Sequence, residues 1–244
     1  MAKGPFHFKR FSIEQDGAAM KVGTDGIVLG CWTPIRGARK VLDAGAGNGY
    51  VGIMLLQRME PNSTLIGVEI EHDAAVQCRD NYERQPFPMQ TQAWQGRLQD
   101  AADDKPEWAG TIDLMVSNPP FYRDKPKSPI AARNFARHDD SLKMGEVVAA
   151  ASRLLRPGGR LCAIWPQDRE EEWSAWASGH GFSIMQTVQV QTMRHLAPKR
   201  ILSEWIKGEY DGQRATSTLT LEGNATLDFT DQYLHYVRPY LRGT

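Results

Sequence analysis

The chain has 244 residues, 29 Lys and Arg against 29 Asp and Glu, and a hydrophobic fraction of 41%. This length suits one α/β domain with a sizeable core, and the composition excludes wholesale disorder. The apolar runs are too short to cross a bilayer, no secretory signal is visible, and the three cysteines lack ligand-like spacing. We therefore expect a cytoplasmic protein with no membrane association and no metal. Because the net charge is zero, the protein as a whole does not attract nucleic acid, and any contact with it would depend on local basic segments.

Short apolar segments alternate with helical ones along most of the chain. Strands are expected at 40–44, 65–70, 89–94, 111–117, 161–165, 182–192 and 201–207, and helices at 50–59, 72–84, 142–155 and 169–178. This alternation predicts an α/β fold whose mostly parallel sheet has helices on both faces. The closely spaced strands near the end predict an antiparallel edge. A hairpin-like strand is expected at 216–221 and a helical tail at 231–241.

A glycine-rich segment leaves the first sheet strand and enters a helix. Gly45, Gly47 and Gly49 have the spacing Gly-x-Gly-x-Gly, with Asp43 ahead of them. This is neither the dinucleotide fingerprint nor a phosphate-binding P-loop. An acidic residue here would repel a pyrophosphate, but it suits S-adenosylmethionine (SAM), which carries an amino group and no phosphate. Glu69, at the end of the second strand, can accept both ribose hydroxyls, although a tight turn and a solvated strand end are the plain structural alternative.

In these features the chain resembles the class I SAM-dependent methyltransferases. The residues that match their cofactor motifs are Asp43, Gly45, Gly47, Gly49 and Glu69. The resemblance implies a Rossmann-like fold with SAM at the carboxyl ends of the strands. After the third strand, Arg97 stands where these enzymes often carry an acidic residue, and Asp100 follows three positions later. We place the cofactor's adenine against Arg97 and Leu98, because backbone N–H groups and apolar contact can hold it there.

The fourth strand ends in the segment Asn118, Pro119, Pro120, Phe121, Tyr122. Two prolines fix the backbone and present carbonyls without N–H donors, so Asn118 and Pro119 can accept both hydrogens of a planar –NH₂ group. Phe121 or Tyr122 can stack on the attached ring. We expect Asn118 to contact the cofactor as well. The pattern is shared by N6-adenine, guanine-N2 and protein-glutamine methyltransferases, so it indicates the reaction without fixing the substrate. The alternative is that Pro-Pro merely ends a strand.

A further segment lies ahead of the first sheet strand and contains Lys21, Thr24 and Asp25. Thr24 and Asp25 could cap a helix. Alternatively the segment folds over the methionine end of SAM, with Asp25 near the amino group and Lys21 near the carboxylate. With the other motifs, and with Pro198-Lys199-Arg200, it makes the whole chain resemble the bacterial tRNA (adenine-N6)-methyltransferases that modify adenine 37 of a valine tRNA.

The resemblance implies tRNA, a valine tRNA in particular, as the partner. Basic residues follow the fourth strand, and we expect RNA contacts from Tyr122, Arg123, Lys125, Lys127, Arg133 and Arg137. Arg194, Lys199 and Arg200 add a second basic segment. An unpaired purine in an anticodon loop can be flipped into a pocket at low cost. The alternative is that these basic residues only face the solvent and contact no RNA.

These features lead to one expected function and several rivals. We expect N6-methylation of adenine in tRNA by a monomer, with residues 1–40 as a cofactor-covering extension that is compact with the methyltransferase domain at 41–244. The nearest alternatives are the same chemistry on guanine N2 of ribosomal RNA or on a protein glutamine. A non-catalytic RNA-binding or SAM-sensing protein on the same fold is the alternative of a different class.

Overall fold

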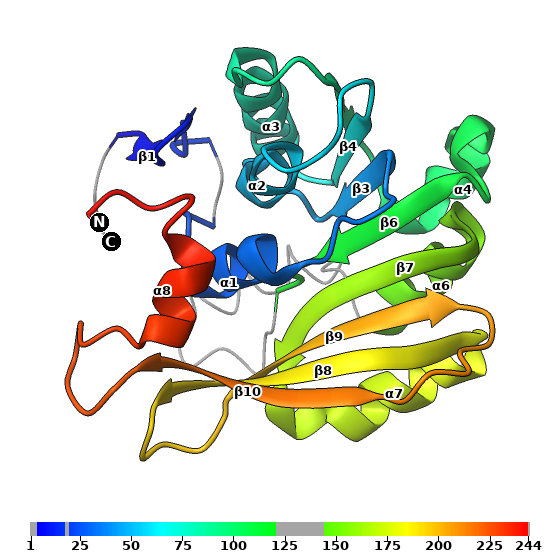
Figure 1. The fold of residues 1–244 in the computed structure, drawn as a ribbon. Coiled ribbons are helices and arrows are strands. Elements are labelled where there is room, and N and C mark those ends of the chain that lie inside the picture. Colours follow the sequence, from blue (N-terminus) through cyan, green and yellow to red (C-terminus); the bar gives the residue numbers. More distant parts are fainter. Residues whose placement is uncertain (1–3, 18–19, 121–143, 244) are drawn as a thin grey trace, which may run out of the picture.

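The computed structural model describes residues 4–17, 20–120 and 144–243. Its central sheet has eight strands in the order β10-β8-β9-β7-β6-β3-β4-β5 (Figure 1). Their bounds are β3 Lys40–Ala44, β4 Thr64–Glu69, β5 Gln90–Gln95, β6 Ile112–Ser117, β7 Leu155–Pro166, β8 Phe182–Met193, β9 Arg200–Lys207 and β10 Ala215–Glu222. A separate antiparallel pair is formed by β1 Phe6–His7 and β2 Ser12–Ile13.

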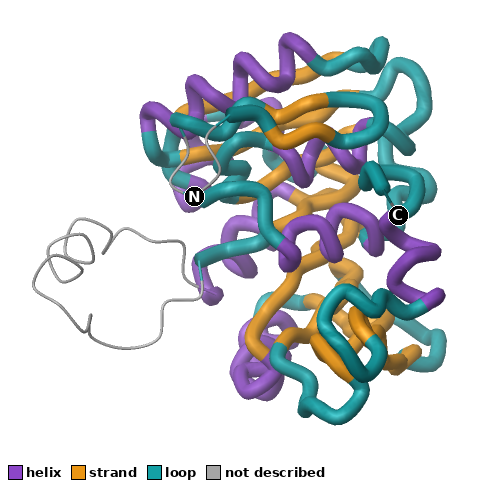
Figure 2. The backbone as a smooth tube through the Cα atoms, turned by 90° about the vertical axis from the view of Figure 1, so that its left-hand side faces the viewer, coloured by secondary structure: helices purple, strands orange, loops and turns teal. Residues whose placement is uncertain are grey.

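The helices cover both faces of this sheet. Their bounds are α1 Thr24–Trp32, α2 Tyr50–Leu56, α3 His72–Arg84, α4 Ala101–Asp104, α6 Met144–Leu154, α7 Glu170–Gly179 and α8 Asp231–Val237, with short 3₁₀ turns at Leu98–Asp100, Pro106–Trp108 and Gln167–Arg169. Buried side chains of α1, α2, α3 and α8 pack on one face of the sheet, and those of α4, α6 and α7 pack on the other. The arrowheads of β6 and β10 point to the left in Figure 1, and this side of the molecule faces the viewer in Figure 2. No helix among the described residues is long and apolar enough to span a membrane.

The predicted fold class is confirmed. Parallel pairing runs from β5 through β4, β3 and β6 to β7, while β9 is antiparallel to both β7 and β8. The hairpin expected for the last strand is wrong, because β10 pairs in parallel with β8 along Ala215–Glu222. Helix α6 ends just before Arg156–Gly159, as expected, but β7 begins earlier than expected, at Leu155, and its pairing with β6 is irregular between Leu155 and Arg160.

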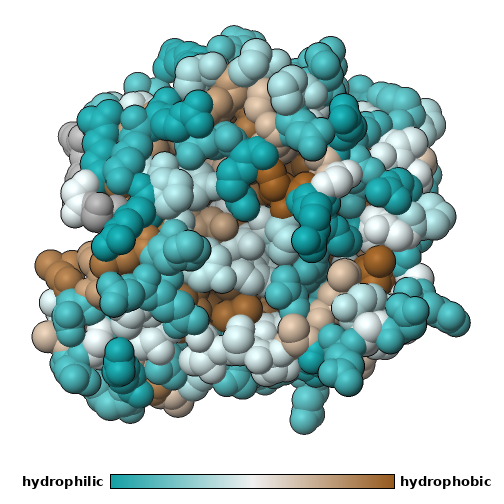
Figure 3. Space-filling model, in the orientation of Figure 1, coloured by the Kyte–Doolittle hydropathy of each residue, from teal (hydrophilic) through white to brown (hydrophobic). Residues whose placement is uncertain are grey.

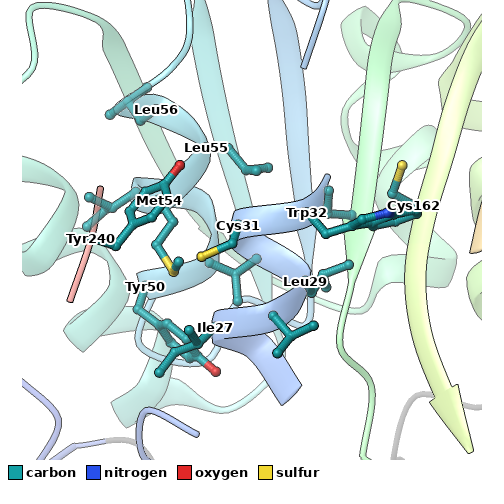
Figure 4. Close-up of a cluster of buried hydrophobic side chains, with 14 of the residues drawn as sticks. Ile27, Leu29, Cys31, Trp32, Tyr50, Met54, Leu55, Leu56, Cys162 and Tyr240 are labelled. Carbon is teal, nitrogen blue, oxygen red and sulfur yellow. The ribbon is translucent and has the colours of Figure 1, made fainter. Parts of the chain in front are cut away.

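Alternation of side chains along the strands explains the two-sided core. In β3, Val41 belongs to the cluster under α1 and α2, whereas Leu42 belongs to the cluster under α4 and α6. Successive residues of a strand point to opposite faces, so a strand buried on both faces is apolar throughout. Leu29 and Trp32 of α1 pack with Met54 of α2 and with Cys162 of β7 in the first cluster (Figure 4). The N-terminal helix is therefore part of the main core.

Candidate active site

The glycine segment forms a tight turn between β3 and α2. The N–H groups of Gly45 and Ala46 both donate to the carbonyl of Val68 at the end of β4, at 2.9 and 3.0 Å. Gly45, Gly47 and Gly49 all have positive φ, at 71°, 57° and 82°. Residues other than glycine rarely adopt this conformation, which accounts for the Gly-x-Gly-x-Gly spacing. At the start of α2, the N–H groups of Tyr50 and Gly52 donate to the side chains of Asn48 and Asp43.

Glu69 lies directly beside this turn. One carboxylate oxygen accepts the N–H of Gly47 at 2.8 Å, and the other accepts the N–H of Glu71 at 3.0 Å. The side chain is half-buried. A Cβ atom built on Gly47 would have no atom within 4 Å, so open space adjoins the loop at the position where Glu69 contacts it. The carboxylate and the loop thus form one wall of a single site.

Asp43 is enclosed behind the loop. Its exposed fraction is 2%, and its Oδ2 accepts the N–H of Gly52 in α2 at 2.9 Å. Burial raises its pKa to about 7, the hydrogen bond from Gly52 opposes that rise, and the negative charge of Glu69 adds to it. The carboxylate therefore secures α2 to β3 in this structure. Direct contact with a cofactor amino group stays a prediction.

The N-terminal segment packs against the first residue of α2. The hydroxyl of Tyr50 donates to the carbonyl of Gly23 at 3.3 Å, and a Cβ on Gly26 would lie 1.8 Å from that hydroxyl. Helix α1 does begin at Thr24, but Gly23 occupies the N-cap and no side chain caps the helix. Thr24 and Asp25 instead lie in its first turn.

The two charged residues of this segment have protein partners. Asp25 Oδ2 accepts a hydrogen bond from Arg200 Nε of β9 at 2.8 Å, and both side chains are about one-third exposed. Lys21 Nζ donates to the carbonyl of Gln15 at 2.7 Å and lies 3.5 Å from Asp16. Sequence reasoning did not find the pairing of Asp25 with Arg200, because 175 residues separate the two.

Arg97 and Leu98 follow β5 on the same edge of the sheet. Leu98 is 3% exposed and belongs to the core, so only its backbone can meet a ligand. Arg97 is exposed and forms an ion pair of 3.7 Å with Asp100. The arginine and the aspartate that the sequence placed near the adenine therefore neutralise each other.

Asn118 immediately follows β6, the strand that pairs with β3. Ser117 is paired with Ala44 of β3, and its buried hydroxyl donates to the carbonyl of Ala44 at 2.9 Å. Gly45 and Asn118 are the next residues of these adjacent parallel strands, which lie about 4.8 Å apart. Pro119 is buried, whereas Asn118 and Pro120 are half-buried. The structure thus brings Asn118 and Pro119 close to the glycine loop.

The remaining residues of the predicted site lie outside the described part of the chain. These residues are Phe121, Tyr122, Arg123, Lys125, Lys127, Arg133 and Arg137. Their assignment to base stacking and to RNA contacts stays a prediction.

Two supporting residues behind the loop gave no signal in the sequence. A Cβ on Gly49 would lie 2.6 Å from the ring of Tyr82, and a Cβ on Gly52 would lie 2.5 Å from the Tyr82 hydroxyl. Cys78 lies 2.9 Å from the same Gly49 position. Both residues come from α3, and burial raises the pKa of the Tyr82 hydroxyl well above its usual value. Tyr82 and Cys78 therefore pack directly against the buried side of the glycine loop.

These residues fit a small nucleoside cofactor. Open space at Gly47 can take a ligand against the backbone, and Glu69 presents a carboxylate to paired hydroxyls at that point. Among the described residues no cluster of His, Cys, Asp and Glu is suited to a metal ion.

Comparison with solved structures defines the class of protein. A predicted O-methyltransferase from Agrobacterium tumefaciens superposes with a TM-score of 0.66 at 17% identity, over 91% of this chain and all of that one. A SAM-dependent methyltransferase from Aquifex aeolicus gives a TM-score of 0.50 at 10% identity, over 69% of this chain and 82% of that one. The fold is that of the class I methyltransferases, and the Methyltransferase small domain family matches residues 27–173. The chain is a methyltransferase whose cofactor is SAM.

Comparison with curated proteins gives the particular family. A tRNA1(Val) (adenine(37)-N6)-methyltransferase from Porphyromonas gingivalis is 36% identical over 96% of this chain and 94% of its own length. A protein of the same name from Tolumonas auensis is 38% identical over 81% of both chains. The chain belongs to the tRNA1(Val) (adenine(37)-N6)-methyltransferase family.

Proposed function

We propose that this protein methylates the exocyclic N6 of adenine 37 in the anticodon loop of a valine tRNA, in the cytoplasm. The observation that carries the proposal is the register of β3 and β6, in which the Ser117–Ala44 contact holds Asn118 beside the glycine loop. The names of the relatives supply the substrate, because the Asn-Pro-Pro pattern alone fits several planar amines and amides.

Within this proposal the cofactor residues divide the work of holding SAM. Glu69 accepts the ribose hydroxyls, the main chain of the glycine loop approaches the methionine end, and the backbone of Arg97 and Leu98 faces the adenine. Asp43 supports the loop from behind and supplies negative charge close to the amino group. Lys21, Thr24 and Asp25 cover the methionine end, with residues 1–40 folded as one unit with the rest of the chain. When bound, SAM supplies an electrophilic methyl group on a positively charged sulfur.

Asn118 and Pro119 prepare the nucleophile. The lone pair of an adenine amine is delocalised into the ring, so the amine is a weak nucleophile. The Asn118 side-chain oxygen and the Pro119 carbonyl accept its two hydrogens and favour a tetrahedral nitrogen whose lone pair points at the methyl group. Correct alignment of two reactants is worth up to about 7–11 kcal/mol. No strong general base is needed, since the extra proton can leave after transfer. Pro120 stiffens this edge, and Phe121 stacks on the base.

The test is transfer of labelled methyl from SAM to bulk tRNA that lacks the modification, with ribosomal RNA and protein offered in parallel reactions, followed by digestion and mass spectrometry. The expected product is N6-methyladenosine. Label in N2-methylguanosine of ribosomal RNA, or in protein glutamine, would replace the proposed substrate and keep the chemistry. SAM binding without transfer to any of the three would favour a sensing or binding protein.

A further inference from the structure

Asn81 of α3 is a polar side chain in the interior of the protein. Hydrophilic residues cover most of the face shown in Figure 3, but only 1% of the Asn81 surface is exposed. A buried amide is costly unless its hydrogen-bonding groups are satisfied. Asn81 satisfies them with two segments that are distant in the sequence, the glycine loop at Asn48 and the N-terminal segment at Glu14.

One hydrogen bond joins Asn81 to the glycine loop. Its Nδ2 donates to the carbonyl oxygen of Asn48 at 2.8 Å. In a regular helix this carbonyl would accept the N–H of Gly52, four residues later, but that N–H donates to Asp43 Oδ2 at 2.9 Å. Asn81 and Asp43 therefore bond the two groups that one helical hydrogen bond would otherwise join. Together these two side chains fix the junction between the loop and α2.

The position of Asn48 also affects the contact between the loop and Glu69. Asn48 lies between Gly47 and Gly49, whose φ angles are 57° and 82°. The N–H of Gly47 donates to the Glu69 carboxylate at 2.8 Å. A shift of the Asn48 carbonyl would therefore move Gly47, and with it the carboxylate that we assign to the ribose hydroxyls.

Two further hydrogen bonds join Asn81 to the N-terminal segment. Its Oδ1 accepts the N–H of Glu14 at 3.0 Å, and its Nδ2 donates to the Glu14 carbonyl at 2.8 Å. Neighbouring antiparallel strands exchange the same pair of bonds, so the side-chain amide binds Glu14 as another strand would. With the bond to Asn48, the amide uses both of its N–H groups and its oxygen. The two carbonyls and one N–H around it also fix its orientation.

The residue after Glu14 extends this contact to the charged segment that we expect to cover SAM. Gln15 is 6% exposed, and its Oε1 accepts the N–H of Val22 at 3.2 Å. The Gln15 carbonyl accepts a hydrogen bond from Lys21 Nζ at 2.7 Å. A displacement of Glu14 would therefore also displace Lys21 and Val22.

We propose that Asn81 is a positioning residue of the cofactor site. It holds the glycine loop at Asn48 and the N-terminal segment at Glu14 in one arrangement before SAM arrives, so that binding requires little further ordering of the chain. The inference rests on the proposed function, which assigns the loop and the segment to SAM. Because Asn81 is buried, it acts through these backbone groups rather than by contact with the cofactor.

The test compares Asn81→Ala with wild type in SAM binding by calorimetry, without tRNA and well below the melting temperature of each protein. The dissociation constant is expected to rise about tenfold, because the ligand must then order the loop and the segment. Turnover of unmodified bulk tRNA at saturating SAM should stay within about twofold of wild type, since Asn118 and Pro119 keep their places.

A second variant, Asn81→Asp, keeps the shape of the side chain and the acceptor for the Glu14 N–H but lacks both donors. It is expected to bind SAM about as weakly as Asn81→Ala, and it carries the test if the alanine variant does not fold. Wild-type affinity for SAM in the folded variants would overturn the proposal. Lower turnover at saturating SAM with wild-type affinity would overturn it as well.

The matched control is Gln77→Ala, one helical turn earlier in α3. Gln77 Oε1 accepts the N–H of Gly17 at 3.0 Å, so this variant loosens the same N-terminal segment and leaves the bond to Asn48 in place. It is expected to bind SAM within about threefold of wild type. A loss equal to that of Asn81→Ala would show that the contact with the loop contributes nothing.

Binding is measured without tRNA, so the two proposals can fail separately. If wild type binds SAM and Asn81→Ala binds it weakly, but wild type methylates no tRNA, the proposed function is refuted and the role of Asn81 stands.

Discussion

The two halves of the sheet, divided at β6, present different kinds of surface to their ligands. On the β3–β4–β5 side, the glycine loop is held by buried groups: Asp43 bonds Gly52, and Tyr82 packs against Gly49. On the β7–β9–β8–β10 side, the loops at 194–199 and 223–230 are mostly exposed to solvent, and Arg200 at the start of β9 pairs with Asp25. A small cofactor of fixed shape requires close packing around its backbone contacts. A macromolecular substrate binds through charge and a wide contact area, and solvent-exposed loops can supply both.

The largest effect is expected at the junction of the two halves. Asn118→Ala removes one of the two acceptors for the amine and should lower turnover about 10²–10³-fold. Loss of one hydrogen-bonding group that stabilises a transition state has an effect of this size in other enzymes. The SAM dissociation constant should stay within about threefold of wild type, because the glycine loop and Glu69 supply the other contacts to the cofactor. Single-turnover kinetics and calorimetry measure the two quantities. Unchanged turnover would remove the proposed mechanism.

The buried carboxylate of the cofactor half should make stability depend on pH. Burial raises the pKa of Asp43 to about 7 in the folded state, whereas an unfolded aspartate titrates near 3.9. The protonated form therefore favours folding below about pH 4, and this contribution is lost as the pH rises through about 7. The loss amounts to roughly 4 kcal/mol.

Asp43→Asn keeps an oxygen for Gly52 N–H and removes the titration. Urea unfolding at pH 4.5 and 7.5 should show the variant gaining a few kcal/mol relative to wild type between these two values. Parallel pH profiles for the two proteins would show that Asp43 is ionised in both folded and unfolded states.

Two glycines of the loop should respond differently to the same added methyl group. Gly49→Ala places a Cβ 2.6 Å from Tyr82 at a φ of 82°, so the free energy of unfolding should fall by about 3 kcal/mol. Gly47→Ala meets open space, so only the strain of its φ of 57° remains, about 1 kcal/mol. Gly47→Ala should nevertheless weaken SAM binding, since the methyl group occupies the space beside Glu69. Equal stability losses would refute the packing described behind Gly49.

The smallest effect is expected in the substrate half. Leu227 has a φ of 66° and is 73% exposed, so Leu227→Asn should raise the free energy of unfolding by about 0.5–1 kcal/mol, because Asn tolerates this conformation. Leu196→Asn is the control, since Leu196 is exposed without a positive φ. Thermal melting measures both variants. A lower melting temperature for Leu227→Asn would mean that this leucine stabilises the fold.

The sequence predicted the cofactor half better than the substrate half, for a physical reason. Gly45–Gly49 and Glu69 are local signals, because each backbone conformation and each strand end is encoded at its own position. The strand at Ala215–Glu222 was also visible locally, but its parallel partner β8 was not, since pairing depends on contacts distant in sequence.

The site residues that could not be predicted from the sequence contact partners that are distant along the chain. Tyr82 supports Gly49 across 33 positions, and Arg200 pairs with Asp25 across 175. Nothing in the neighbourhood of either residue marks its partner. The roles of Phe121 and Tyr122 remain predictions from the motif, because these residues lie outside the described ranges.

The most direct test of the account uses two transcripts of valine tRNA that differ only at position 37. With labelled SAM, the transcript carrying adenine at that position should accept the methyl group and release N6-methyladenosine on digestion. The transcript carrying guanine should bind with similar affinity and accept none. Equal labelling of the two transcripts, or label in any nucleoside other than N6-methyladenosine, would contradict the assignment of Asn118 to an adenine amine in the anticodon loop.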